Sequence, residues 1–98
     1  MPFEIHFSKL ARVNFGELRK YDQNIIAQTI FEQLVHQPDQ ITRHRKQLEP
    51  NPFAEWELRI GDYRVFYRIR TEEETVVIVA IGRKIHNQVF VSGKELLL

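Results

Sequence analysis

The sequence predicts an α+β fold in which a helical hairpin packs on one face of a small antiparallel sheet. Apolar residues recur every three to four positions between residues 22 and 37, a spacing typical of an amphipathic helix. Between residues 55 and 70, apolar and polar residues alternate around a Gly-Asp pair, as in a β-hairpin. The chain has 98 residues, and we expect residues 1–98 to form a single domain.

The first elements are a short strand and a helix. The alternating run FEIHF, residues 3–7, predicts the strand. Ser8 is a favoured N-cap residue, so we expect a helix from about Lys9, with Leu10 and Val13 facing inward.

A second, more strongly periodic helix is predicted over residues Asp22–Gln37, and Pro38 ends it. Its inward positions are Ile26, Ile30 and Leu34, spaced by four. The following segment, residues 39–54, is polar and contains two prolines. We therefore expect a loop there, with at most one turn of helix at residues 42–48.

The second half predicts a meander of three strands. A two-residue loop at Gly61-Asp62 places Arg59 opposite Arg64 and sorts the side chains onto two faces. One face collects Trp56, Leu58, Ile60, Tyr63, Val65, Tyr67 and Ile69; the other collects Glu55, Glu57, Arg59, Arg64, Phe66, Arg68 and Arg70. The helices should cover the first, aromatic face and leave the second, arginine-rich face open.

The third strand, TVVIVAIG, has apolar residues pointing both ways, so we expect it to be central in the sheet. The run QVFVSG near the C-terminus is compatible with a further short strand.

Charge and composition narrow the function classes. The net charge is +1, but residues 41–71 hold seven cations and four anions, so the positive charge is a local patch. There is no cysteine, and the four histidines lack local metal-ligand spacing, so we expect no metal or cofactor. MPFEIHFSKL lacks the pattern of a signal peptide, and we expect a cytoplasmic protein.

The paired arginines are the main candidates for a binding site. Arg59 opposite Arg64 is a local conflict, and neither has an obvious partner in the sequence. Arginine suits phosphate, so these two beside the ring of Phe66 predict a cradle for a nucleic-acid backbone. The alternative is ordinary ion pairing, with Arg68 opposite Glu55 and Arg70 near the acidic turn at residues 71–74.

The hairpin segment has the sequence LRIGDYRVFYRI, and the strand after it ends in IGRK. This pattern resembles the signature of the RelE/ParE superfamily of bacterial toxin–antitoxin toxins. The order of the predicted elements agrees, and the details EWELRIGDYRVFYRI and VAIGRK look most like the RelE-type branch. This resemblance implies a toxin that enters the ribosomal A site and cleaves mRNA there, through attack of the RNA's own 2′-hydroxyl on the neighbouring phosphate. It also implies a cognate antitoxin that neutralises the toxin.

Residue by residue, the resemblance makes Arg64 the phosphate-binding arginine and Arg59 a second basic position. Arg83 or Lys84 falls where the family has a catalytic arginine. The catalytic candidates are therefore Arg64, Lys84 and His86, the last as the nearest titratable side chain. The RNA-binding candidates are Arg59, Arg64, Phe66, Arg83, Lys84, Phe90, Arg43, Arg45 and Lys46.

The chain departs from the family pattern at three positions. Glu55 and Glu57 stand where the best-known RelE toxins have lysines, and Phe90 stands where they have a tyrosine that stacks on the base. A phenylalanine retains stacking but not the hydroxyl. His44 is a second titratable candidate.

Two alternatives stay open from the sequence. One is a non-enzymatic ParE-like inhibitor of DNA gyrase, and the other is a catalytically decayed toxin that only binds its antitoxin.

Overall fold

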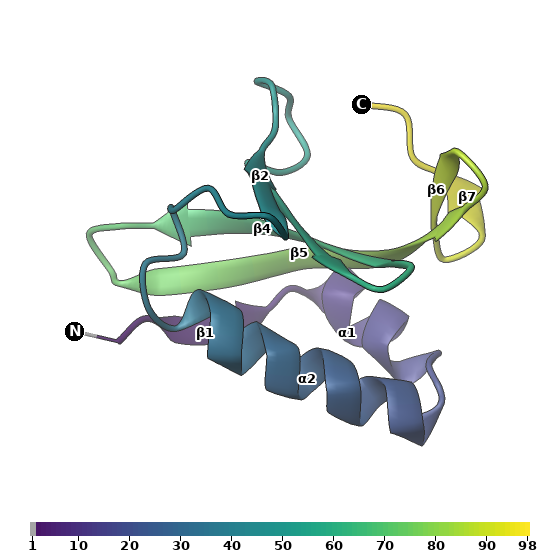
Figure 1. Ribbon diagram of the computed structural model, residues 1–98, viewed down its shortest axis with the longest axis horizontal. Helices are drawn as coiled ribbons and strands as arrows, with labels where there is room; N and C mark the ends of the chain where they lie inside the picture. Colours follow the sequence, from purple (N-terminus) through teal and green to yellow (C-terminus); the bar gives the residue numbers. More distant parts are fainter. Residues whose placement is uncertain (1) are drawn as a thin grey trace.

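The computed structural model describes residues 2–98 and shows two helices on one side of a twisted sheet (Figure 1). In chain order the elements are β1 (Glu4–Phe7), α1 (Lys9–Gly16), α2 (Lys20–Leu34), β2 (Arg45–Gln47), β3 (Trp56–Ile60), β4 (Tyr63–Arg70), β5 (Thr75–Ile85), β6 (Gln88–Val91) and β7 (Lys94–Glu95). The predicted α+β class is confirmed. None of the helices in the described part of the chain is long and apolar enough to span a membrane.

Strand β5 is central, as expected. The strand order is β2-β3-β4-β5-β6-β7, and β1 pairs with β5 in parallel, whereas the other strand pairs within residues 2–98 are antiparallel. β1 and β6 pair with different parts of the same edge of β5. Between these two parts, side chains form hydrogen bonds with backbone groups of β5. Ser8 Oγ donates to the Val79 carbonyl at 2.7 Å, and Asn14 Oδ1 accepts from the Ile81 amide at 3.0 Å.

The hairpin register is confirmed. β3 and β4 pair with Arg59 opposite Arg64, and Gly61 adopts a φ of 58° in the turn, a conformation that glycine reaches without strain. The alternation of the two strands therefore sets which side chains face the helices, as the sequence indicates.

The helices are partly as predicted. Ser8 caps α1 by accepting from the Ala11 amide, and Ile26, Ile30 and Leu34 of α2 are fully buried. The inward face of α1 is predicted wrongly: Leu10 and Val13 are 39% and 49% exposed. Ala11 and Asn14 are buried instead, because Asn14 must reach the backbone of β5.

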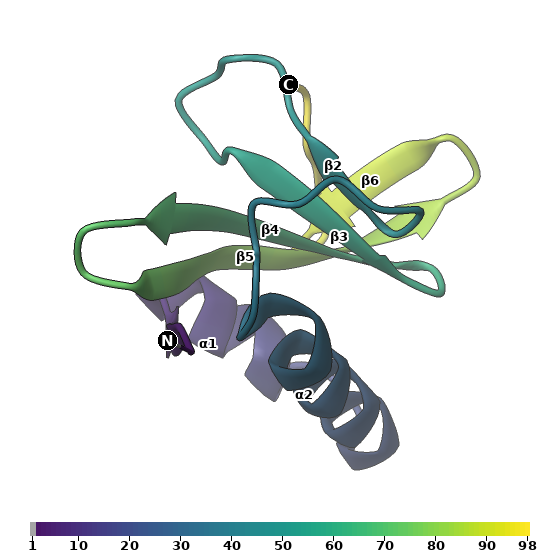
Figure 2. The same ribbon diagram turned by 60° about the vertical axis from the view of Figure 1, so that its left-hand side comes forward.

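The arginine-rich face is not fully open, contrary to expectation. Phe66, Ala54 and Ala80 are buried there, with Phe53 and Leu96 among the residues packed against them. Residues 39–54 are mostly loop, as expected, but the edge strand β2 (Arg45–Gln47) takes the place of the helical turn. The loop that follows β2 lies on the side of the sheet away from the helices (Figure 2), and its residues pack against Phe66. The helix-covered face holds the larger core.

Tyr67 connects the sheet to the segment after α2 through a side-chain hydrogen bond. Its hydroxyl donates to the Pro38 carbonyl at 2.8 Å, and burial raises the pKa of this phenol above its ordinary value near 10. A raised folded-state pKa means that the stabilisation is complete below pH about 10 and is lost as the pH rises further.

Tyr67→Phe should therefore lower the free energy of unfolding by about 1 kcal/mol at neutral pH. The difference from wild type should shrink at pH values above about 10, where ionisation already weakens the wild type. Urea unfolding at pH 7 and pH 11 measures both effects, with the exposed Tyr21→Phe as control. A difference that stays constant across this pH range would contradict the role given to the phenol.

Candidate functional site

A hollow rich in cations lies on the side of the sheet away from the helices, and we call it the basic hollow. Its volume is about 450 Å³. It is lined by Ile41, Thr42, Arg43, His44, Arg45, Lys46, Glu57, Arg59, Arg64, Lys84 and Val89. Six of these residues are arginine or lysine and one is a carboxylate, so its electrostatic character favours an anion.

Strand register brings cations from three strands together. Arg59 lies opposite Arg64, and Arg64 lies opposite Gly82 of β5. Lys84 follows Gly82 by two residues and thus shares its face of the sheet. Gly82 also allows close packing, because a Cβ there would lie 2.8 Å from the Phe90 carbonyl oxygen.

Arg64 is held in a fixed orientation. It is 7% exposed, and its Nη1 donates to the carbonyls of Gly61 and Tyr63 at 2.9 Å each. Its Nε lies 4.0 Å from Glu57 Oε1. Arg64 therefore has an ionic partner in Glu57, its diagonal neighbour across the hairpin.

Glu57 lies between two cations on the same face. Its Oε1 is 4.0 Å from Lys46 Nζ as well as from Arg64 Nε, and the residue is 9% exposed. Glu57 is thus the one carboxylate among the residues that line the basic hollow.

The remaining candidates from the basic loop differ in their exposure to solvent. Arg43 and Lys46 are exposed and line the basic hollow. Arg59 Nη2 donates a hydrogen bond to the Arg43 carbonyl at 3.1 Å. Arg45 is buried, and its Nη1 donates to the Gln37 carbonyl at 2.7 Å. Because Arg45 pairs opposite the core residue Leu58, most of its side chain is buried, and it offers a ligand in the hollow less access than Arg43 or Lys46.

Phe66 is not available for base stacking. It is 1% exposed, and its ring packs edge-on against Phe53 with centroids 5.6 Å apart. Residues of the loop at 48–54 pack against Phe66, so the position expected to stack on a base is buried in this structure.

Arg83 and Phe90 lie on the other face of the sheet from Arg64. They pair across β5 and β6, and the Arg83 guanidinium lies 5.5 Å from the ring centroid of Tyr63. The Tyr63 hydroxyl donates to Asp22 Oδ2 at 2.9 Å. Burial and this bond raise the pKa of Tyr63, and the same bond lowers the pKa of Asp22.

The two histidine candidates lie in different parts of the structure. His44 lines the basic hollow. His86 is exposed in the turn after β5, with a φ of 58°, and it is not among the lining residues. The structure thus brings Arg64, Lys84 and His44 together, and it does not bring His86, Arg83 or Phe90 to them.

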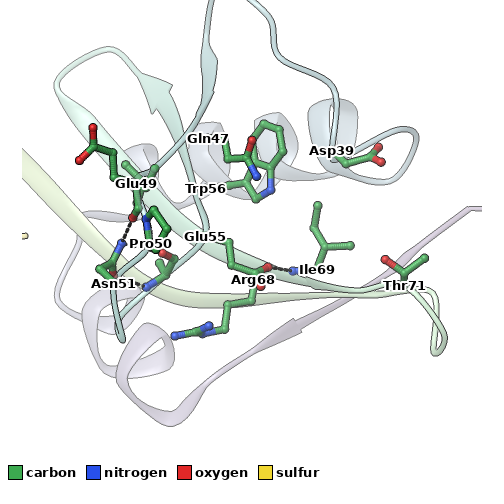
Figure 3. Close-up of a pocket in the computed structure, with 12 residues that line it drawn as sticks. Asp39, Gln47, Glu49, Pro50, Asn51, Glu55, Trp56, Arg68, Ile69 and Thr71 are labelled. Atoms are coloured by element: carbon green, nitrogen blue, oxygen red, sulfur yellow. Dashed lines mark hydrogen bonds between the residues drawn. The ribbon is translucent and has the colours of Figure 1, made fainter.

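A larger hollow of about 930 Å³ lies near the start of β3, and Figure 3 shows its lining side chains. It holds the carboxylates of Asp39, Glu49 and Glu55 against one cation, Arg68. This excess of negative charge disfavours a phosphate ligand despite the larger volume.

Of the two ion pairs named as the alternative to phosphate binding, the one made by Arg70 is present. Glu55 accepts from the Ile69 amide at 2.9 Å, as Figure 3 shows, while Arg68 donates to the Pro52 carbonyl at 2.7 Å. Arg70 pairs with Glu73 of the acidic turn at 3.7 Å, as expected.

Comparisons with solved structures identify the fold. The chain is similar to the RelBE2 toxin–antitoxin complex from Mycobacterium tuberculosis, with 27% identity and a TM-score of 0.74 over 86% of this chain and 93% of that chain. It is also similar to the archaeal RelE–RelB complex from Pyrococcus horikoshii, with 18% identity and a TM-score of 0.70 over 88% and 99% of the two chains. For the Escherichia coli RelBE complex the identity is 16% and the TM-score 0.68, over 86% and 99%.

No curated protein matched the sequence. Residues 5–86, most of the chain, match the family described as the ParE toxin of the type II toxin–antitoxin system, parDE. With the fold, this match confirms the resemblance drawn from GDYR and IGRK. The chain therefore belongs to the toxins of type II toxin–antitoxin systems, within the RelE/ParE superfamily.

Proposed function

We propose that this toxin inhibits translation by cleaving mRNA on the ribosome, and that a cognate antitoxin neutralises it. The observation that carries the proposal is the basic hollow, in which Arg59, Arg64 and Lys84 converge from three strands. A site that gathers cations in this way fits the phosphate of an RNA backbone. The proposal places the protein in the cytoplasm, where ribosomes are found.

The mechanism is mainly electrostatic. Arg64 is oriented by two carbonyls before the substrate arrives, so little reorganisation is needed when negative charge develops on the scissile phosphate. Lys84 is exposed at the hollow and is the candidate that donates a proton to the departing 5′-oxygen. The ribosome would supply the positioning of the mRNA.

The antitoxin is inferred from the relatives and from the helix surfaces. The three similar structures are toxin–antitoxin complexes. In this chain the outer sides of the helices expose large apolar residues, which suit the apolar face of a partner helix. These residues are Leu10, Val13, Tyr21, Ile25 and Phe31.

Expression from a regulated promoter, followed by mapping of mRNA 5′ ends, tests the proposal. The wild type should arrest growth and produce new cuts inside translated frames. Arg59→Gln should reduce the cuts by about 10-fold or more, because it removes a charged donor from the hollow. Arg70→Gln is the matched control, since Arg70 is exposed and pairs with Glu73 outside the hollow. Growth arrest without cuts would contradict mRNA cleavage.

Arg64→Ala is a poorer test than the sequence suggests. Arg64 is buried and bonded to the hairpin turn, so its removal changes folding and phosphate binding together. Arg59 and Lys84 are exposed, so substitutions there test phosphate binding with little effect on folding.

A second candidate function is inhibition of DNA gyrase, and the match to the ParE family favours it. In that case growth arrest should come with inhibited DNA supercoiling and intact mRNA. A decayed toxin that only binds its antitoxin should cause no arrest while remaining soluble and folded.

A further inference from the structure

Glu57 is a carboxylate in the hollow that is proposed to hold the scissile phosphate. It lies on β3 on the same face as Arg59 and Arg64, and it lines the basic hollow. Only 11% of its side chain is exposed, which limits its hydration. Among the residues lining this hollow, all within the described part of the chain, it is the one that carries a carboxylate.

Ion pairing alone does not account for Glu57. Its two cationic neighbours, Lys46 and Arg64, lie at 4.0 Å, a separation too long for direct hydrogen bonds. Arg64 donates from Nη1 to two backbone carbonyls, and its Nε stays 4.0 Å from Glu57 Oε1. A mostly buried carboxylate normally accepts closer bonds than these.

We propose that Glu57 is the general base that takes the proton from the attacking 2′-hydroxyl; this inference rests on the proposed ribonuclease function. The O–H bond of the 2′-hydroxyl breaks and its proton moves to a Glu57 carboxylate oxygen. The 2′-oxygen forms a bond to phosphorus, and the bond from phosphorus to the 5′-oxygen breaks. The 5′-oxygen takes a proton from the ammonium of Lys84. The products are a 2′,3′-cyclic phosphate and a 5′-hydroxyl, and solvent restores both protein groups.

The surrounding cations remove the objection that a carboxylate repels phosphate. Five exposed or hollow-facing cations accompany the one carboxylate, leaving a surplus of four positive charges. They are Arg43, Lys46, Arg59, Arg64 and Lys84. Even a dianionic transition state therefore enters a site of net positive charge.

The test is single-turnover cleavage of mRNA in the A site of purified ribosomes, measured as a function of pH. Glu57→Gln should lower the cleavage rate by about 100- to 10,000-fold while binding to the ribosome changes little. For the wild type the rate should rise with pH and then level off, which is the acidic limb expected of a reaction that uses a general base. The residual rate of Glu57→Gln should lack this acidic limb. Glu55→Gln, two residues away and outside the basic hollow, is the matched control and should cleave normally.

Glu57→Asp guards against a folding defect, because it keeps the charge and removes one methylene group. It should be folded by circular dichroism, cleave more slowly than wild type and retain the acidic limb. If Glu57→Gln cleaves at the wild-type rate or faster, or keeps the acidic limb, Glu57 is not the base. If wild-type protein itself cuts no mRNA on ribosomes, the proposed function fails and the role of Glu57 fails with it.

Discussion

Lys84→Gln is expected to abolish growth arrest and to lower mRNA cleavage on the ribosome by about 100- to 1,000-fold. Lys84 lines the basic hollow at the end of β5, and its side chain is exposed. Glutamine keeps a similar length and polarity but cannot carry the positive charge or donate a proton to the leaving oxygen. The fold should be unaffected, because the contact of Lys84 with the hairpin is made by its backbone amide to the Asp62 carbonyl.

Lys94→Gln provides the matched control for this substitution. Lys94 is an exposed lysine on β7 that does not line the basic hollow. It should arrest growth as the wild type does. Thermal unfolding of both variants should match the wild type within about 1 °C, because substitutions of exposed side chains that make no specific contact change stability little. Full toxicity of Lys84→Gln would remove Lys84 from the mechanism.

Gly82→Ala should lower the free energy of unfolding by about 1–3 kcal/mol. The added Cβ would lie 2.8 Å from the Phe90 carbonyl oxygen and 3.0 Å from Cγ2 of Val91. Backbone atoms of β6 cannot rotate away as a flexible side chain can, so β5 and β6 must separate. Chemical denaturation measures the loss directly.

Gly16→Ala is the control for this second substitution. Apart from the adjacent residues and the backbone of α1 itself, no heavy atom lies within 4 Å of a Cβ placed at Gly16, the last residue of α1, so alanine fits there. The variant should be as stable as the wild type or slightly more stable, since alanine favours helices. Equal stability of Gly82→Ala and wild type would show that β6 does not pack closely on Gly82.

Local patterns predicted the meander well. The alternation on either side of Gly61-Asp62 fixes the register of β3 and β4, because a slip of one residue would exchange the two faces. The spacing of Ile26, Ile30 and Leu34 likewise identified the buried side of α2. In both cases the information lies within a few neighbouring residues.

Contacts between distant segments were not predictable in the same way. β2 is a three-residue strand in a polar segment, and it forms because β3 offers an unpaired edge. Phe66 is covered by a loop whose path depends on that pairing. Asn14 weakens a helix by propensity, yet it is buried because its side chain bonds the amide of Ile81 on β5.

The candidate site was predictable only in part, because local pairing places some of its residues and pairing between distant segments places the others. The hairpin register correctly brought Arg59 and Arg64 together. The position of Arg83 and Phe90 depends on how β5 and β6 pair with their neighbours, and a register shift at Phe66/Tyr67 in the pairing of β4 with β5 hides this from simple alternation. The contact between Glu57 and Arg64 follows from the diagonal neighbours of the hairpin, a signal that was present in the sequence but was not used.

The most direct test of the central claim is to add purified toxin to ribosomes that hold a defined mRNA codon in the A site, and to measure gyrase supercoiling in parallel. The basic hollow predicts a single cut within that codon that leaves a 2′,3′-cyclic phosphate, together with unaffected supercoiling. Intact mRNA with inhibited supercoiling would contradict the account and assign the toxin to DNA gyrase.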